Sequence, residues 1–221
     1  VRVLNEEACP LFAIREIKNL KNVESPKWLK QHLENIGIGS ISAIVDVTNY
    51  MSYSFGRPMH AYDADKIKGN LIIDSLKSSE KMLALNDKEY ELGLGDIVVK
   101  DDNGIHCLAG IIGGKNSSCN ESTTRILLEA ACFDSRHIMR TGRKTMIDTD
   151  SRYRLERNVD RTFTLKAIDY ATNLILTICG GSPSAPEVAG NDKLPIRMIE
   201  FPFDFFVSRA GFSIKAEEII A

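Results

Sequence analysis

The sequence predicts an α+β fold, because strand-like and helix-like segments are interleaved without a strict β-α-β rhythm. A composition of 43% hydrophobic and 26% charged residues over 221 positions is that of an ordinary globular protein with a sizeable core. Strand patterns lie at residues 9–20, 71–76, 82–85, 97–99, 106–113 and 125–133. Helix patterns lie at residues 25–38, 134–148 and 160–179.

Two neighbouring segments near the N-terminus receive different assignments. Residues 25–38 predict a helix, since Pro26 suits a first helical position and Gly37 suits the C-terminal stop. Residues 41–49 predict a strand that runs into a second helix-like segment, because Val45 and Val47 alternate with polar residues. The last part of the chain, residues 196–221, reads as a separate and truncated unit after a break rich in Gly, Ser and Pro.

The charge and the motifs disfavour several classes of protein. A net charge of −2 and a pI near 6.1 disfavour a nucleic-acid binder that is basic over its whole surface, although a local basic patch stays possible. No apolar run approaches the roughly 18–20 residues of a membrane helix, and no secretory leader is visible. Because the chain starts at Val1 and ends within a helical pattern, we interpret it as a fragment of a longer protein.

Cysteine and histidine spacing indicates neither disulfides nor a metal. The five cysteines are odd in number and form no CxxC pair, which fits a reducing, cytoplasmic setting. The four histidines show no HxH or HExxH spacing, so we expect no metal site and no cofactor in this fragment.

The stretch VDVTNYMSYSFGRPMHAYD, residues 45–63, gathers polar and turn-forming residues directly after an apolar run. AGIIGGKNSS, ILLEAACF and DTDSRYRLERNVD follow it in that order. Each motif alone is weak, because GG turns and TNY triplets are common. Together they resemble the editing module of the β subunit of bacterial phenylalanyl-tRNA synthetase, from about Cys9 to about Ala189.

The resemblance implies a three-layer sandwich of two β-sheet layers and helices, with residues 1–189 as the editing domain and 190–221 as the start of the next domain. It implies hydrolysis of mischarged Tyr-tRNA(Phe), with ligation chemistry on a partner α subunit. In the family two α and two β subunits form a heterotetramer that binds tRNA(Phe), without a membrane. ATP and magnesium are then expected for the whole enzyme.

Glu129 is the first candidate site residue, because it is the one carboxylate in the apolar run RILLEAACF. By resemblance it reads the tyrosine hydroxyl, whereas the residues alone also allow a solvent-facing position or a salt bridge to Arg125 or to the basic segment. Gly113 ends the strand in AGIIGG, where a glycine permits close approach of a ligand. By resemblance it lines the aromatic pocket, and an ordinary αL turn is the alternative.

The remaining candidates are Thr149, Ser151, Asn49 and His60. By resemblance Thr149 and Ser151 border the pocket, and both also suit helix capping. By resemblance Asn49 and His60 lie beside the scissile ester, as the catalytic candidates. Asn49 can hold a ribose hydroxyl, the amino acid or a water, and His60 can orient or deprotonate water, although its chemical duty stays open.

Residues 136–161 carry eight basic side chains against four acidic ones, which suits either tRNA guidance or internal ion pairs. Three positions depart from the family pattern. Gly39 stands where the family usually carries a basic residue, Asn158 replaces a usual glycine, and Arg152 adds bulk beside Ser151. These departures leave an alternative function open, in which the editing module has decayed into a structural or tRNA-interaction platform.

Overall fold

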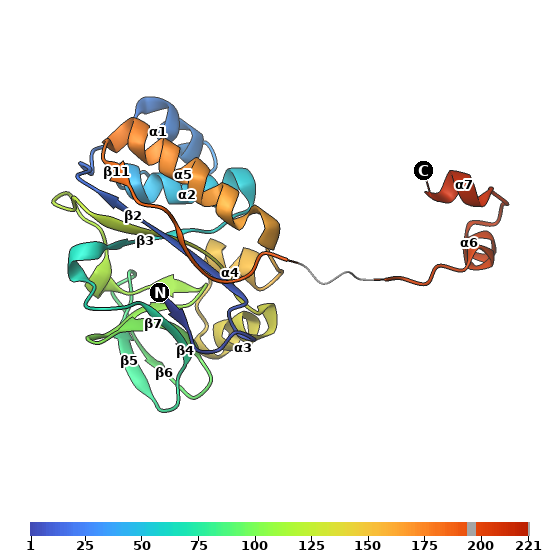
Figure 1. Ribbon diagram of the computed structural model, residues 1–221, viewed down its shortest axis with the longest axis horizontal. Coiled ribbons are helices and arrows are strands. Elements are labelled where there is room, and N and C mark those ends of the chain that lie inside the picture. Colours follow the sequence, from blue (N-terminus) through green and yellow to red (C-terminus); the bar gives the residue numbers. More distant parts are fainter. Residues whose placement is uncertain (194–197, 221) are drawn as a thin grey trace.

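The computed structural model describes residues 1–193 and 198–220, and its main part consists of three layers. Helices form the first layer, a sheet centred on β10 (Ile126–Cys132) forms the second, and a sheet centred on β7 (Ile97–Asp101) forms the third (Figure 1). The predicted α+β class and three-layer sandwich are therefore confirmed.

The two sheets are mostly antiparallel. The β10 sheet has the order β11-β2-β10-β3, with β12 also pairing to β2, and it comprises β11 (Ser182–Pro183), β2 (Leu11–Lys18), β10, β3 (His60–Asp63) and β12 (Glu187–Gly190). The β7 sheet has the order β1-β4-β7-β8-β9, with β1 (Arg2–Val3), β4 (Ile72–Ser75), β7, β8 (Gly104–Leu108) and β9 (Ile112–Gly113). A separate hairpin pairs β5 (Glu80–Leu83) with β6 (Glu89–Leu92).

Strand β10 is apolar along its length because both of its faces are buried. Ile126 and Leu128 pack in the core beneath the helix layer, while Ala131 packs in the core between the two sheets. A strand with one solvated face would alternate polar and apolar side chains, whereas a middle-layer strand does not. Glu129 lies on the face of β10 that points toward the β7 sheet, which places its carboxylate between the layers.

The helix layer consists of α1 (Lys27–Glu34), α2 (Ala43–Phe55) and α5 (Thr164–Cys179), which lie together over the β10 sheet (Figure 1). Two further helices, α3 (Ser135–Thr145) and α4 (Asp150–Leu155), follow β10 in the chain. Short 3₁₀ turns are η1 (Ala64–Lys66), η2 (Lys115–Ser117) and η3 (Arg161–Phe163). None of the helices in the described part of the chain is long and apolar enough to span a bilayer.

The predicted strand at residues 41–49 is wrong, because most of this segment belongs to α2. Ile44, Val47 and Met51 recur at helical spacing and are fully buried in the core beneath the helix layer. Asp46 is also buried, and its carboxylate accepts hydrogen bonds from the backbone amide of Ile41 at 2.9 Å and from two serine hydroxyls. Tertiary burial and this carboxylate at the first turn outweigh the strand propensity of the valines.

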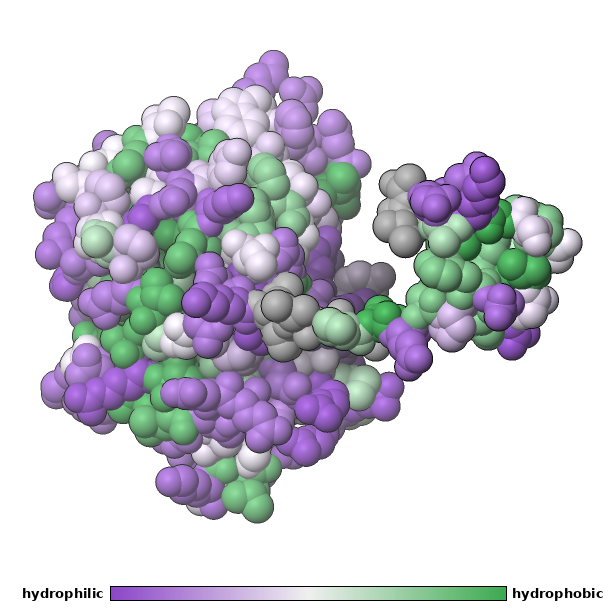
Figure 2. Space-filling model, turned by 45° about the vertical axis from the view of Figure 1, so that its right-hand side comes forward, coloured by the Kyte–Doolittle hydropathy of each residue, from purple (hydrophilic) through white to green (hydrophobic). Residues whose placement is uncertain are grey.

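The C-terminal part contains α6 (Phe203–Ala210) and α7 (Ala216–Ile220), and residues 194–197 and 221 of the predicted second unit lie outside the described residues. Figure 2 shows hydrophobic side chains on this part, and Phe203, Phe205 and Phe212 are exposed. Strand β12 extends to Gly190, so the predicted boundary at residue 189 falls at the end of the β10 sheet. The division into two domains stays a prediction.

Candidate functional site

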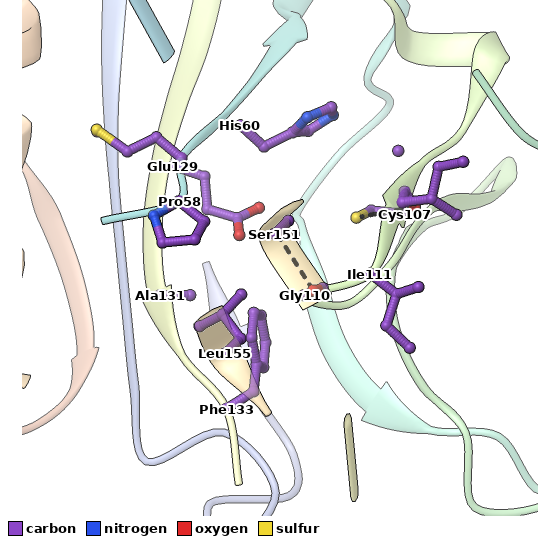
Figure 3. Close-up of a pocket in the computed structure, with 13 residues that line it drawn as sticks. Pro58, His60, Cys107, Gly110, Ile111, Glu129, Ala131, Phe133, Ser151 and Leu155 are labelled. Carbon is purple, nitrogen blue, oxygen red and sulfur yellow. Dashed lines mark hydrogen bonds between the residues drawn. The ribbon is translucent and has the colours of Figure 1, made fainter. Parts of the chain in front are cut away.

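A pocket of about 90 Å³ opens between the two sheets, and we call it the intersheet pocket (Figure 3). Its walls come from β3 and the loop before it, from β8, β9 and β10, from the loop that joins β8 to β9, and from α4. Four of the six predicted site residues line it, namely His60, Gly113, Glu129 and Ser151. The other lining residues are Pro58, Met59, Cys107, Gly110, Ile111, Ile112, Ala131, Phe133 and Leu155.

Glu129 brings the single carboxylate into this mostly apolar pocket. The residue is 6% exposed, and its carboxylate points into the pocket (Figure 3). The alternatives of a solvent-facing side chain and of a salt bridge to Arg125 do not hold, because Arg125 pairs with Glu16 and Asp65 instead. Burial raises the pKa of Glu129 to about 7, although a hydrogen bond from Tyr62 and the charge of Arg57 oppose that rise.

Tyr62 is a site residue that sequence reasoning missed. It is fully buried on β3, and its hydroxyl donates a hydrogen bond to Oε2 of Glu129. An aromatic residue in a strand is ordinary, so nothing in its type marks it. The pairing follows from the register, in which His60 lies opposite Glu129 and Tyr62 lies two residues further along the same face.

His60 is a neutral group at the wall of the pocket. Burial lowers its pKa to about 4, so the ring is uncharged at neutral pH. Its Nε2 atom is buried and finds no hydrogen-bond partner within residues 1–193 and 198–220. The His60 ring stands edge-on to the Tyr62 ring, with 4.5 Å between their centroids.

Gly113 lies in strand β9 and not in an αL turn, because its φ is outside the left-handed region. The alternative reading as an ordinary turn glycine is therefore wrong, and Gly113 lines the intersheet pocket. A Cβ atom at this position would come within 2.5 Å of Cε1 of His60. The absence of a side chain here lets the imidazole lie directly against the backbone.

A second depression adjoins the intersheet pocket, and we call it the outer hollow. It has a volume of about 370 Å³, and it holds Asn49 and Thr149, the two predicted site residues that the intersheet pocket lacks. Both cavities share Pro58, Met59 and Ser151 in their walls. The structure thus gathers all six residues in two adjacent cavities, but it separates Asn49 from His60.

Thr149 and Ser151 also have the capping roles that their types suggest. The Thr149 hydroxyl accepts from the Arg152 amide as the N-cap of α4 and donates to the Ile111 carbonyl at 2.7 Å. The Ser151 hydroxyl donates to the Gly110 carbonyl at 3.2 Å (Figure 3). These bonds hold the start of α4 against the loop between β8 and β9, at the edge of both cavities.

The turn before β3 is anchored by a buried arginine that sequence reasoning also missed. Arg57 is 1% exposed, and its guanidinium donates to the Ala131 carbonyl and to the Thr164 hydroxyl, both at 2.9 Å. Gly56 ends α2 in the left-handed conformation that permits this reversal of direction. Arg57 therefore fixes Pro58 and Met59 against β10, where they separate the two cavities.

Ion pairs neutralise several basic side chains of the segment at residues 136–161. Lys144 pairs with Asp96, Arg152 with Glu156, Arg154 with Asp150, and Arg157 with Glu156. Arg140 and Arg143 are exposed on α3 and make no ion pair with any described residue. Guidance of a nucleic acid by this segment stays a prediction, and it rests on the few basic side chains that ion pairs do not neutralise.

The three departures from the family pattern have different structural settings. Gly39 is exposed beside Ile38, which lines the outer hollow, and an added Cβ would meet nothing within 4 Å. Asn158 has a φ of 66°, a conformation that asparagine tolerates better than most residues. Arg152 lines neither cavity and donates to the carbonyls of Gly142 and Ile147, so the expected added bulk beside Ser151 is directed elsewhere.

Within residues 1–193 and 198–220, no cluster of three or more His, Cys, Asp or Glu side chains is placed to hold a metal ion. The chemistry that these cavities offer comes from a buried carboxylate, a neutral imidazole, an amide and hydroxyl groups.

Comparisons with known proteins connect this arrangement to a family. The chain is similar to the phenylalanine–tRNA ligase beta subunit of Rickettsia bellii, with 47% identity over 243 residues and 97% of this chain covered. It is also similar to that of Brucella suis, with 42% identity over 220 residues and 98% covered. The chain spans only 28% and 27% of the length of these relatives.

The fold is also found in a solved structure, an N-terminal fragment of the phenylalanyl-tRNA synthetase beta subunit from Pyrococcus horikoshii. That match has a TM-score of 0.53 at 12% identity, and it covers 99% of this chain and 61% of the other. The B3/4 domain model matches residues 8–180, which include both cavities and all six predicted site residues. The chain belongs to the B3/4 domain family.

Proposed function

We propose that this chain hydrolyses the ester that joins tyrosine to tRNA(Phe), as the editing part of a phenylalanine–tRNA ligase beta subunit. The observation that supports the proposal most is the Glu129 carboxylate, which is buried in an otherwise apolar pocket. A buried carboxylate is costly unless polar groups pair with it. Tyr62 pairs with Oε2, and the phenol of a tyrosine substrate would pair with Oε1.

The pairing explains how tyrosine would be told apart from phenylalanine. An apolar pocket rejects an added hydroxyl by only about a hundredfold, so a first site cannot exclude tyrosine well. A site that hydrogen-bonds the hydroxyl rejects an analogue without it by about 10⁴–10⁵, because a buried polar group is then left unpaired. Glu129 would therefore accept tyrosine and reject phenylalanine, which protects correctly charged tRNA from hydrolysis.

The two cavities suit the two ends of this substrate. The intersheet pocket is smaller than the roughly 150 Å³ cavity that holds benzene, so the phenol ring would also occupy its mouth beside Ser151. The ester and the terminal ribose would then lie in the outer hollow, near Asn49 and Thr149. Asn49 can both donate and accept hydrogen bonds, which suits it to hold a ribose hydroxyl or a water.

The proposed reaction is attack by water on an activated ester. The water oxygen bonds to the carbonyl carbon, the bond from that carbon to the ribose oxygen breaks, and the ribose oxygen takes a proton. Free tyrosine and uncharged tRNA(Phe) result. His60 lines the intersheet pocket and not the outer hollow, so it would contact the bound tyrosine as a neutral hydrogen-bonding group, since its pKa of about 4 leaves it uncharged at neutral pH. In this scheme most of the rate acceleration comes from holding the water next to the ester carbonyl carbon.

The remaining expectations concern the longer protein. We propose that it works in the cytoplasm with an α subunit that performs the ligation, using ATP and magnesium, and that both subunits contact tRNA(Phe). These statements rest on the similarity to beta subunits, of which this chain covers less than a third.

A second candidate function is a platform for structure or tRNA interaction without hydrolysis. Gly39 favours it, because it leaves no side chain at an exposed position next to Ile38 of the outer hollow, where the family usually has a positive charge. The intersheet pocket and its carboxylate favour the hydrolytic function, since a platform needs neither.

Deacylation by the full-length protein with its ligase partner tests the proposal. We expect hydrolysis of Tyr-tRNA(Phe) well above the rate without enzyme, little hydrolysis of Phe-tRNA(Phe), and a loss of about a hundredfold or more in the Glu129→Ala variant. Glu121→Ala is a matched control, because Glu121 is exposed in a loop outside both cavities. Hydrolysis equal to the spontaneous rate, or unaffected by Glu129→Ala, would reject the hydrolytic function.

A further inference from the structure

A phenol already lies at the Glu129 carboxylate, and it belongs to the protein. Tyr62 is fully buried on β3 and donates its hydroxyl hydrogen to Oε2 of Glu129. Tyr62 is absent from the walls of the intersheet pocket, whereas Glu129 is part of them. The Tyr62 hydroxyl therefore contacts two pocket-lining side chains, Glu129 and Cys107, without lining the pocket itself.

We propose that Tyr62 is a positioning residue, which holds one oxygen of the Glu129 carboxylate so that the other faces the pocket and receives the substrate hydroxyl. This inference rests on the proposed function and names a residue that sets its specificity. Figure 3 shows the Glu129 carboxylate directed into the cavity. A carboxylate has acceptor sites on both oxygens, so the bond from Tyr62 leaves Oε1 available.

Two contacts of Tyr62 indicate that it supports the wall of the intersheet pocket as well as the Glu129 side chain. Its ring stands edge-on to His60 at 4.5 Å between centroids, and His60 lines the pocket directly. Its hydroxyl reaches Glu129 across the pair of strands β3 and β10. Tyr62 thus touches both ionisable groups that face the intersheet pocket from the β10 sheet.

The hydrogen bond also favours the charged form of the carboxylate. Burial raises the pKa of Glu129, and the bond from Tyr62 opposes that rise. The pKa of Tyr62 itself is raised by burial and by the neighbouring Glu129, so its hydroxyl keeps its proton and stays a donor. Removal of this hydroxyl should leave Glu129 protonated to a higher pH and free to rotate.

The test compares Tyr62→Phe, Glu129→Gln and the double variant in the full-length protein with its ligase partner, using Tyr-tRNA(Phe) hydrolysis. Phenylalanine keeps the ring against His60 and removes only the hydroxyl. We expect Tyr62→Phe to slow hydrolysis at pH 7 by about tenfold, with the acidic limb of the pH–rate profile moved to higher pH. In the Glu129→Gln background the same change should have no further effect, because Tyr62 acts through Glu129.

A second readout does not depend on activity. Infrared difference spectra against the Glu129→Gln variant isolate the carboxyl band of Glu129, and its pH midpoint should rise in Tyr62→Phe. The matched control is Tyr90→Phe, which removes a hydroxyl that accepts a hydrogen bond from Asn86 on the β5–β6 hairpin, away from Glu129. The control should change neither the band nor the rate.

Three results would overturn the inference: an unmoved Glu129 midpoint, faster hydrolysis in Tyr62→Phe, or an effect of the same size with and without the Glu129 carboxylate. A failure of the proposed function looks different. In that case the wild-type protein does not hydrolyse Tyr-tRNA(Phe), while the infrared midpoint still reports whether Tyr62 holds the carboxylate.

Discussion

The imidazole of His60 lies directly against the backbone of Gly113, with 2.5 Å between Cε1 of the ring and the position that a Cβ atom would take. This contact joins β3 of one sheet to β9 of the other, and both residues line the intersheet pocket. Real Cβ atoms essentially never approach so closely, so any side chain at residue 113 must displace the ring.

We therefore expect Gly113→Ala to push His60 into the pocket and to lower Tyr-tRNA(Phe) hydrolysis strongly. Overpacking of this kind costs roughly 1–3 kcal/mol of folding free energy, which a chemical denaturation curve will measure. Gly39→Ala is the matched control, because its added methyl group meets nothing within 4 Å. An unchanged rate in Gly113→Ala would contradict the placement of the substrate ring in this pocket.

Glu129 and His60, which both line the intersheet pocket, predict opposite dependences of stability on pH. Glu129 has its pKa raised from 4.5 to about 7 by burial, so the folded state binds its proton more tightly. Its contribution is present below pH 4.5 and is lost as the pH rises to about 7. His60 has its pKa lowered from 6.5 to about 4, so its contribution is present above pH 6.5 and is lost as the pH falls to about 4.

Between about pH 4.5 and 6.5 these two contributions oppose each other in the wild-type protein. In Glu129→Gln only the His60 contribution remains, so the free energy of unfolding should rise with pH by a few kcal/mol. In His60→Gln only the Glu129 contribution remains, so the free energy of unfolding should fall with pH by a similar amount. Denaturation curves at several pH values across this window, compared with wild type, check both signs. If the free energy of unfolding changed with pH in the same direction in both variants, burial would not shift the pKa values of Glu129 and His60 in opposite directions.

Removal of the Arg57 side chain should destabilise the protein more than any change at the surface. Its guanidinium bonds the Ala131 carbonyl and the Thr164 hydroxyl, both of which Arg57→Met would leave without this donor. We expect a loss of about 3 kcal/mol or more in the free energy of unfolding, measured by denaturant. Arg143→Met, at an exposed position of α3, should change it by less than about 0.5 kcal/mol.

Gly39→Arg should raise the activity without changing the stability. Residue 39 is exposed next to Ile38, which lines the outer hollow, and its backbone conformation is open to any residue. A cation there would attract the phosphates at the end of the tRNA, so we expect faster hydrolysis at low salt and a smaller gain at high salt. Gly39→Gln supplies length without charge as the control, and equal rates for both variants would exclude an electrostatic contribution.

Some site residues could be predicted because their residue type alone is unusual in its sequence context. Glu129 stands out as the one charge in an apolar strand, and a middle-layer position explains why the strand is apolar on both faces. The α2 helix was not predictable in the same way, because Val45 and Val47 have the same alternation in a strand. The buried carboxylate of Asp46 and the packing against α1 and α5 decide that case, and both are tertiary.

Tyr62 and Arg57 were missed for a related reason. Neither type is unusual at its position in the sequence, and each matters through a partner that is more than sixty residues away. Such pairs depend on strand register and on the path of a turn, which one sequence does not specify.

The position of Glu129 on β10 has a consequence for motion. Strand β10 is bonded to β2 on one side and to β3 on the other, and it is covered by packed layers above and below. Its amide hydrogens should exchange with deuterated solvent only when the whole domain unfolds. The group proposed to discriminate between two amino acids is thus held on a strand that is paired on both edges and packed on both faces, so its selectivity would need no closing lid.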